Sequence, residues 1–343
     1  MTTDGQDDIY DVTILGAGPT GLFGVFYAGM REMKTKIIEA LPEMGGQLTV
    51  LYPEKFIFDV AGFPKVLAKD LVQRLVQQAE QWDPQICLDE RVVGLEYVRE
   101  ASEGVPPIIK LTSDKGQTHL THTLVITAGI GAFSPNKLDR PGVAQYEEKG
   151  GVAYFVKKKA DFRGKRLLIV GGGDSAVDWG LNLKDWTHDI TLIHRRHEFR
   201  AHESSVVELR NSPVQIMTPW ELLEVHGDGE HVTGATIKNN ETEEQRTIPA
   251  DVVLLNLGFK ASLGAIADWG LKSSRRHIFV DGFCQTNLPG VYAAGDVAQP
   301  NEGPQMGLIA VGFAQATIAV NVAKSFIDPK SKIFPGHSSE MKI

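Results

Sequence analysis

Short apolar runs recur along the chain and predict buried strands. The clearest cover residues 11–15, 123–129, 165–170 and 251–258. Two of them lead through a glycine-rich turn into apolar stretches typical of helices, at residues 22–30 and 177–181. A strand, a tight turn and a helix in this order indicate a βαβ unit with a parallel sheet. Because the pattern occurs twice, we expect an α/β protein with two domains of one plan.

The first turn has the spacing G-x-G-x-x-G, from Gly16 through Gly18 to Gly21. The first glycine permits the tight turn, the second lets the backbone approach a pyrophosphate, and the third lets the helix pack on the strand. A second strand, residues 36–38, ends in Glu39, which can accept hydrogen bonds from ribose hydroxyls. The first unit therefore predicts a dinucleotide site.

The second turn has the related spacing G-x-G-x-x-A, and its candidate binding residues are Gly171, Gly173, Asp174, Ser175 and Ala176. The next strand, residues 190–193, is followed by cations instead of a carboxylate: His194, Arg195, Arg196 and Arg200. Guanidinium groups bind a 2′-phosphate with charge-assisted hydrogen bonds, whereas a carboxylate repels it. We therefore expect FAD or NAD at the first turn and NADPH at the second.

A third strand ends in Gly295-Asp296 and places Asp296 at a carboxyl end of the first sheet, where ligands of such sheets bind. A second grip there suits a cofactor longer than NAD, which favours FAD. The predicted fold is two Rossmann-like, three-layer ββα dinucleotide-binding domains, the second inserted into the first. The FAD-binding domain is expected at 1–133 and 257–343, with a C-terminal extension from about 326, and the NADPH-binding domain at 134–256.

Composition narrows the class of protein. The 343 residues carry a net charge of −8, so no nucleic-acid partner is expected. Two cysteines, Cys87 and Cys284, exclude a disulfide framework, a cysteine-rich metal site and a C-x-x-C pair. The apolar stretch 306–323 contains glycine, glutamine and asparagine, which favours a buried helix over a membrane span. The acidic first residues show no secretory leader, and we expect a cytoplasmic protein without metal.

The order of these motifs, with Gly45-Gly46-Gln47 and Gly295-Asp296, resembles the thioredoxin-reductase branch of two-dinucleotide flavoproteins over nearly the whole chain. Members of that branch carry C-x-x-C shortly before the second turn. Here Phe155 and Lys158 stand at the matching positions. An internal dithiol therefore cannot take electrons from the flavin.

Residues 51–64, 194–203 and 328–339 resemble thioredoxin-reductase-like ferredoxin–NADP⁺ reductases, which lack that disulfide. The resemblance implies a homodimer in which Tyr52 stacks on one flavin face. The other face is covered by His337 of the extension, from the partner subunit. It also implies FAD contacts at Gly16, Gly18, Thr20, Gly21, Glu39, Gly46, Gln47, Tyr52, Val92, Phe133, Asp296 and Ser339. Without the resemblance, Tyr52 is also compatible with a half-buried strand position, Phe133 with a core position, and His337 with a surface tail.

The predicted function is electron transfer between NADPH and ferredoxin or flavodoxin through FAD. Two alternatives stay open: a reductase of a quinone or another small acceptor, and a non-catalytic redox sensor. Residues 157–166 form the densest basic run for docking an acidic carrier, and Lys330 and Lys332 form a second. We also expect domain rotation about the crossings near Gly129 and Gly258.

Overall fold

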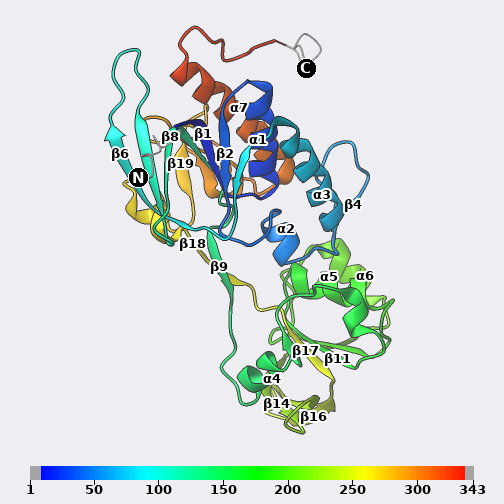
Figure 1. The fold of residues 1–343 in the computed structure, drawn as a ribbon. Coiled ribbons are helices and arrows are strands. Elements are labelled where there is room, and N and C mark those ends of the chain that lie inside the picture. Colours follow the sequence, from blue (N-terminus) through cyan, green and yellow to red (C-terminus); the bar gives the residue numbers. More distant parts are fainter. Residues whose placement is uncertain (1–8, 337–343) are drawn as a thin grey trace. The chain divides into compact units, whose positions relative to one another are not determined.

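The computed structural model describes residues 9–336 and divides into two compact units (Figure 1). Of the described residues, unit 1 comprises 9–50, 56–133 and 261–336, and unit 2 comprises Leu51–Lys55 and Ser134–Lys260. The predicted insertion of one α/β domain into another is confirmed. The return crossing lies at 260/261 rather than 256/257, and the short segment 51–55 joins unit 2.

Unit 1 is built on a seven-stranded sheet in the order β5-β2-β1-β8-β7-β6, with β20 also paired to β8. Its first four strands and β20 are parallel, and β8, β7 and β6 form an antiparallel meander. The strands are β1 (Tyr10–Leu15), β2 (Thr35–Ile38), β5 (Gln85–Cys87), β6 (Val92–Arg99), β7 (Ile108–Ser113), β8 (Thr118–Ile126) and β20 (Val291–Ala293).

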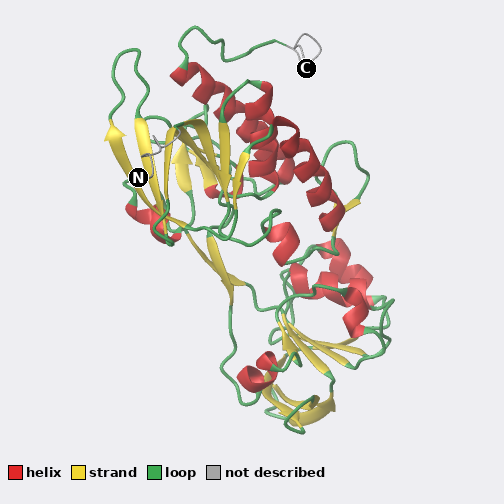
Figure 2. Cartoon of the chain, in the orientation of Figure 1, coloured by secondary structure: helices red, strands yellow, loops and turns green. Residues whose placement is uncertain are grey.

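Helices α1, α3 and α7 pack together in unit 1, coloured red with the other helices in Figure 2. A buried cluster of residues from β2, β6, β7, β8 and β20 forms an apolar core, together with Trp269 and Val297. The three main helices are α1 (Pro19–Met30), α3 (Ala68–Ala79) and α7 (Ile309–Ile327). The other elements of this unit outside the seven-stranded sheet are short: α2 (Gln47–Val50), β3 (Phe56–Ile57), β4 (Val66–Leu67), η1 (Glu80–Trp82), η3 (Gly264–Asp268), β19 (Ile278–Val280), η4 (Gly295–Val297) and β21 (Ala298–Pro300).

Unit 2 repeats the plan with a parallel five-stranded sheet, β10-β17-β11-β12-β13, and an antiparallel three-stranded sheet, β14-β15-β16. Two buried clusters pack against the strands of the parallel sheet. The elements are α4 (Val143–Glu148), β10 (Val152–Ala153), η2 (Lys159–Phe162), β11 (Leu167–Val170), α5 (Asp174–Leu183), β12 (Ile190–Ile193), α6 (Glu203–Arg210), β13 (Gln215–Met217), β14 (Trp220–Gly227), β15 (Val232–Asn239), β16 (Gln245–Pro249) and β17 (Val252–Leu255).

Two paired strands carry the chain across the boundary between the units: β9 (Ala132–Pro135) and β18 (Phe259–Ser262). Each contains a boundary residue of the division. The crossings therefore lie within the two strands, a few residues after the expected positions near Gly129 and Gly258. The rotation expected there stays a prediction.

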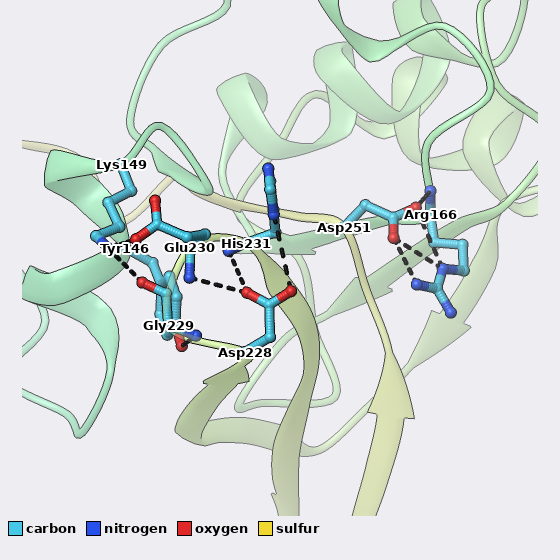
Figure 3. Close-up of polar contacts among 8 residues, drawn as sticks. All are labelled: Tyr146, Lys149, Arg166, Asp228, Gly229, Glu230, His231 and Asp251. Carbon is cyan, nitrogen blue, oxygen red and sulfur yellow. Dashed lines mark hydrogen bonds and ion pairs between the residues drawn. The ribbon is translucent and has the colours of Figure 1, made fainter.

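Polar contacts at the surface of unit 2 hold its loops (Figure 3). Asp228 accepts hydrogen bonds from the backbone N–H groups of Glu230 and His231, at 2.8 and 2.7 Å. Lys149 pairs with Glu230 at 2.7 Å. Separately, the carboxylate of Asp251 accepts from the Arg166 backbone at 2.8 Å and from its guanidinium group. The Arg166 charge is thus already partnered.

The apolar helix expected at 306–323 is α7, which begins three residues later and ends at Ile327. Its length and composition would suit a membrane span. However, seven of its residues, including Val320 and Asn321, are buried in the protein, and it packs on α1 and η4. This is the packing of a core helix, so α7 is weak evidence for a span. The expected extension accordingly begins at Asp328, after the helix.

Candidate functional site

The first glycine-rich turn has the geometry that its spacing predicts. Gly16 adopts φ +111°, and a Cβ there would lie 2.6 Å from the Thr127 carbonyl oxygen. A Cβ at Gly21 would lie 1.9 Å from the Gly16 oxygen, so only glycine lets α1 begin this close to β1. A Cβ at Gly18 would meet nothing within 4 Å. The turn is therefore closed towards the protein and open at Gly18, as a pyrophosphate requires.

Glu39, which the motif marks as a ribose-binding residue, also holds the turn in place. One carboxylate oxygen accepts from the Ala17 N–H at 2.7 Å, and the other accepts from the Leu41 N–H at 3.0 Å. Burial raises the pKa of Glu39, and the backbone hydrogen bonds oppose that rise. The Ala40 N–H adds a third backbone hydrogen bond, so one of the about four lone pairs of the carboxylate remains for a further donor. The residue is thus placed to serve the ribose while fixing the turn, a second role that the motif alone does not indicate.

The start of α1 is fitted to η4 and α7 through Thr20. A Cβ at Gly295 would lie 2.8 Å from the Thr20 hydroxyl oxygen, and a Cβ at Gly312 would lie 2.2 Å from it. Two glycines distant in sequence therefore make room for one threonine side chain. This packing holds the Gly295-Asp296 turn beside the first glycine-rich turn.

Asp296 lies where several loops of unit 1 converge. Its carboxylate is hydrogen-bonded by the Gln47 side chain, and Gln47 in turn lies beside Gly129. Burial raises the pKa of Asp296, and the charge of Asp59 adds to the rise, whereas Gln47 and His277 lower it. Gly46 also approaches the first turn, since a Cβ there would lie 3.1 Å from the Gly18 Cα. Gly18, Gly46, Gln47 and Asp296 thus belong to one site.

Sequence reasoning missed the residues that support this arrangement. Asp59 accepts a hydrogen bond from the Ile309 N–H at 2.7 Å and so occupies one N–H group at the N-terminus of α7. Gln315 accepts from the Gly295 N–H at 2.8 Å, and Gln305 donates to the Asp296 carbonyl at 3.3 Å. Asp59 and Gln315 lay in stretches that the sequence marked out, residues 51–64 and 306–323, and Gln305 lay just outside the second. None of the three has a motif spacing that would reveal its partner.

The other expected FAD contacts belong to other elements or lie outside the described residues. Val92 begins β6 and is buried in the core of unit 1. Phe133 lies in β9. Tyr52 belongs to unit 2, where it packs against the cluster around Trp179. His337 and Ser339 lie outside the described residues 9–336. The flavin-contact roles of these five residues stay predictions.

The beginning of the C-terminal extension is fastened to unit 1 by Arg31, which the sequence did not single out. This buried guanidinium donates to the Ser331 hydroxyl at 2.9 Å and to the Lys332 and Ile333 carbonyls at 3.0 and 3.3 Å. It also donates to the buried amide of Asn321 on α7. One side chain therefore ties three successive residues of the extension to the core helix.

The second glycine-rich turn, in unit 2, repeats the first. A Cβ at Gly171 would lie 2.4 Å from the Asn256 oxygen, whereas one at Gly173 would meet nothing within 4 Å. Ala176 is fully buried, and Ser175 is half-buried in the first turn of α5. Asp174 accepts from the His202 N–H at 2.9 Å, which draws the segment after β12 towards the turn. This turn too is open on the side that would face a phosphate.

His194 lies against the same turn. A Cβ at Gly172 would lie 2.3 Å from its ring. Burial lowers the pKa of His194 and the charges of its neighbouring arginines lower it further, whereas a hydrogen bond with the Glu198 backbone opposes the change; the neutral imidazole is thereby favoured. Its Nε2 atom and the Asn256 Oδ1 atom are buried without a hydrogen-bond partner in the described part of the chain. Unsatisfied polar atoms beside an open turn fit a site that receives a polar ligand.

Arg195, Arg196 and Arg200 follow on the surface beyond His194, and all three are exposed. The Arg200 N–H donates to the Gly172 carbonyl at 2.7 Å, so this arginine is tied by its backbone to the turn. Among residues 9–336, no carboxylate forms an ion pair with any of the three. The second site therefore carries uncompensated positive charge where the first carries the carboxylate of Glu39.

These two sites define a class of protein: a flavoprotein type of fold with two dinucleotide-binding turns. The sequence profile of the pyridine nucleotide-disulphide oxidoreductase family matches residues 10–323. The chain belongs to this family.

Its relatives include a ferredoxin–NADP reductase of Symbiobacterium thermophilum, 50% identical over 98% of this chain and 99% of that protein. A ferredoxin–NADP reductase of Sulfurisphaera tokodaii is 49% identical over 97% of this chain and 98% of its own. Among solved structures, the thioredoxin reductase of Lactococcus lactis in its FR conformation is similar, with 26% identity and a TM-score of 0.75. It covers 93% of this chain and 99% of its own. The resemblance inferred from the motifs is confirmed.

Proposed function

We propose that this protein passes electrons between NADPH and ferredoxin, or flavodoxin, through FAD. The observation that carries the proposal is the contrast between the two turns. The first is held by a buried carboxylate, Glu39, and the second is flanked by three exposed arginines without ion-pair partners in residues 9–336. The names of the relatives, ferredoxin–NADP reductases at about half identity over nearly the whole chain, support it.

The residues at the first turn fit FAD. The open side of Gly18 and the N-terminus of α1 suit a pyrophosphate, and the remaining lone pair of Glu39 suits a ribose hydroxyl. Asp296, with Gln47 beside it, would hold the ribityl chain or the ring edge. The contacts expected at Tyr52, Val92, Phe133 and Ser339 are part of the proposal.

The residues at the second turn fit NADPH. The open side of Gly173 and the N-terminus of α5 would receive the pyrophosphate. Arg195, Arg196 and Arg200 would bind the 2′-phosphate, each with charge-assisted hydrogen bonds. His194, neutral and lying on the turn, would offer its unpaired Nε2 atom to the ligand.

Bound FAD takes two electrons as a hydride and releases them one at a time. In balance, one NADPH and two oxidised ferredoxins yield NADP⁺, a proton and two reduced ferredoxins. The protein contributes binding and orientation: Glu39 and Asp296 fix one cofactor, and the arginines select the other.

The cysteines argue against delivery of electrons to a disulfide acceptor through this chain. Cys87 and Cys284 are both free, and they are the chain's two cysteines. Burial raises the pKa of Cys284 to about 12 and also raises that of Cys87, so both stay protonated thiols near neutral pH. A protonated thiol is a poor nucleophile. We accordingly propose a one-electron carrier as the acceptor, in a cytoplasmic homodimer whose extension covers the partner's flavin.

Nucleotide selectivity tests the proposal most sharply at one residue. Arg195→Ala removes a guanidinium from the 2′-phosphate site, and a hydrogen bond to a charged group contributes about 1.5–3 kcal/mol. The preference for NADPH over NADH, measured as the ratio of flavin reduction rates at limiting nucleotide, should fall about 10- to 100-fold.

Arg210→Ala is the matched control, since Arg210 is an exposed arginine of the same unit at the end of α6. It should leave the ratio unchanged, and both variants should retain bound FAD. An unchanged NADPH preference in Arg195→Ala would refute the assignment of the 2′-phosphate site.

A further inference from the structure

The chain as a whole is acidic, with 43 acidic residues against 35 Lys and Arg. An acidic carrier would therefore be repelled over most of its surface, and productive docking needs a local basic patch. The basic run at 157–166, chosen from the sequence, is weakened in the structure. Arg166 is paired with Asp251 (Figure 3), and the Lys159 ammonium donates to Asn182 at 3.3 Å. Arg163 lies over the Trp186 ring, 4.8 Å from its centroid.

A different basic segment stands out in unit 1: the turn of residues 272–277, Lys272-Ser-Ser-Arg275-Arg276-His277, just before β19. Lys272, Arg275 and Arg276 are exposed. Within residues 9–336, none of the three takes part in an ion pair or a cation–π contact. Three uncompensated charges thus lie within five residues on the unit that carries the proposed flavin site.

Hydrogen bonds fix the shape of this turn. The Ser274 N–H donates to the His277 carbonyl at 2.8 Å, and its hydroxyl accepts from the His277 N–H at 3.1 Å. The Lys272 N–H donates to the Asn287 side chain at 2.6 Å, and the Lys272 carbonyl accepts from Phe279 at 2.9 Å. A turn held in this way presents its cations without further loss of backbone entropy on binding.

The turn borders a hollow of about 450 Å³, lined by Ser274, Phe279, Gln299, Pro300, Asn301 and Gly303. Phe279 is partly exposed there and offers apolar surface beside the charges. One carboxylate, that of the exposed Glu302, belongs to the loop that lines the hollow. The turn reaches the hollow through Ser274, so its basic charge lies beside a partly apolar surface, which suits a partner with acidic side chains beside an apolar centre.

The turn also lies close to the flavin site. His277 is near enough to Asp296 to influence its ionisation electrostatically. In addition, β21, which pairs with β19, follows directly after the η4 turn that contains Asp296. A protein bound at residues 272–277 would therefore stand at the edge of the site from which electrons leave.

We propose that the turn 272–277 and its adjoining hollow are the docking surface for the acidic one-electron carrier. This inference rests on the proposed function and names the surface through which that function is exercised. It replaces the run at 157–166, which lies on the unit assigned to NADPH.

The experiment compares two double charge reversals in the FAD-loaded protein. Arg275→Glu/Arg276→Glu changes the proposed surface, and Lys157→Glu/Lys158→Glu makes the same change of net charge on unit 2. Binding of oxidised ferredoxin is measured by calorimetry at low and high salt. Reoxidation of the reduced flavin by ferredoxin is followed by stopped flow.

We expect Arg275→Glu/Arg276→Glu to weaken binding and slow reoxidation about tenfold or more at low salt, with a smaller difference at high salt. Flavin bleaching by NADPH should be unchanged, which also shows that the variant is folded. The control pair should change binding less than threefold, because salt screens charges that lie far from the bound partner.

Equal effects of the two pairs would overturn the proposal, because they would reflect net charge alone. No effect of Arg275→Glu/Arg276→Glu would overturn it as well. Failure of the proposed function has a different signature: the unsubstituted protein would neither bind ferredoxin nor be reoxidised by it.

Discussion

At the scale of single residues, Gly312 and Gly18 are required for different reasons: one by packing within the fold and the other by ligand binding. A methyl group at Gly312 would lie 2.2 Å from the Thr20 hydroxyl, whereas one at Gly18 would meet no protein atom within 4 Å. The first glycine is therefore required by packing. The second is required by whatever approaches the turn from outside.

Gly312→Ala should destabilise the flavin-free protein by about 1–3 kcal/mol, as overpacking does. Adding Thr20→Ala removes the hydroxyl and should restore much of the loss, a coupling that chemical unfolding can measure. Gly18→Ala should change the free energy of unfolding by about 0.5 kcal/mol or less. It should nevertheless weaken FAD binding. Equal destabilisation by the two single changes would contradict this division of roles.

Asp296 makes a pH-dependent contribution to stability. Its pKa is raised above the ordinary value of 3.8, so the folded chain binds this proton more tightly than the unfolded chain. Stability is therefore lost as the pH rises through the raised pKa, where a buried carboxyl must ionise. Below 3.8 the carboxyl is protonated in both states and the penalty disappears.

Asp296→Asn keeps an acceptor for Gln47 but cannot ionise, so it should raise the melting temperature of the flavin-free protein at about pH 8. The gain should shrink as the pH falls towards about 4. Asp268→Asn, at an exposed aspartate of the same unit, is the control and should show no such trend. A gain independent of pH would count against the buried carboxylate as its cause.

Residue identities at the turns could be predicted because the glycine spacing follows from the backbone geometry itself. Glu39 and the arginines follow from their position after the second strand of each unit. The pairing of Asp59 with the Ile309 N–H could not be predicted, since 250 residues separate the two and only the fold joins them. The same holds for Thr20 and its two glycines.

At the scale of elements, the C-terminal extension is the segment whose anchoring is newly visible. Arg31, at the end of α1, binds residues 331–333 and the Asn321 side chain of α7. The extension is therefore directed by a residue that lies 300 to 302 positions earlier in the chain.

Arg31→Ala should release the extension, and trypsin should then cleave after Lys330 and Lys332 several-fold faster in the native protein. Arg31→Lys should be cleaved at a rate between those of the unsubstituted protein and Arg31→Ala. A lysine ammonium lacks the planar fork of the guanidinium and cannot reach all these acceptors at once. Arg74→Ala, at an exposed arginine of α3, is the control. Cleavage at the original rate in Arg31→Ala would show that other contacts hold the segment.

Element boundaries were less predictable than element types. The apolar stretch 306–323 indicated a helix, yet α7 begins at Ile309 because Leu308 is extended and Asp59 accepts the Ile309 N–H. The helix continues to Ile327, beyond the apolar stretch that indicated it, and the extension follows from Asp328. Hydrophobicity reports burial, whereas the ends of helices depend on their partners.

At the scale of the whole molecule, the duplicated plan could be predicted in full, because each unit repeats strand, turn, helix and strand. The attachment of residues 51–55 to unit 2 could not, since nothing local distinguishes them from their neighbours in unit 1. Tyr52 lies in this segment, and its expected stacking on a flavin held by unit 1 stays a prediction. Likewise, the docking surface proposed at 272–277 could not be predicted from the sequence. A run of basic residues does not show which of its charges form ion pairs in the folded protein.

The most direct test of the central claim is an anaerobic stopped-flow experiment on the FAD-loaded protein. It is mixed with NADPH and then with oxidised ferredoxin, while the flavin absorbance is recorded. We predict rapid bleaching by NADPH, slower bleaching by NADH, and rapid recovery on addition of ferredoxin. Bleaching without recovery would contradict ferredoxin as the acceptor and favour a quinone or another small molecule. The absence of bleaching would contradict the account of the protein as an NADPH-dependent reductase.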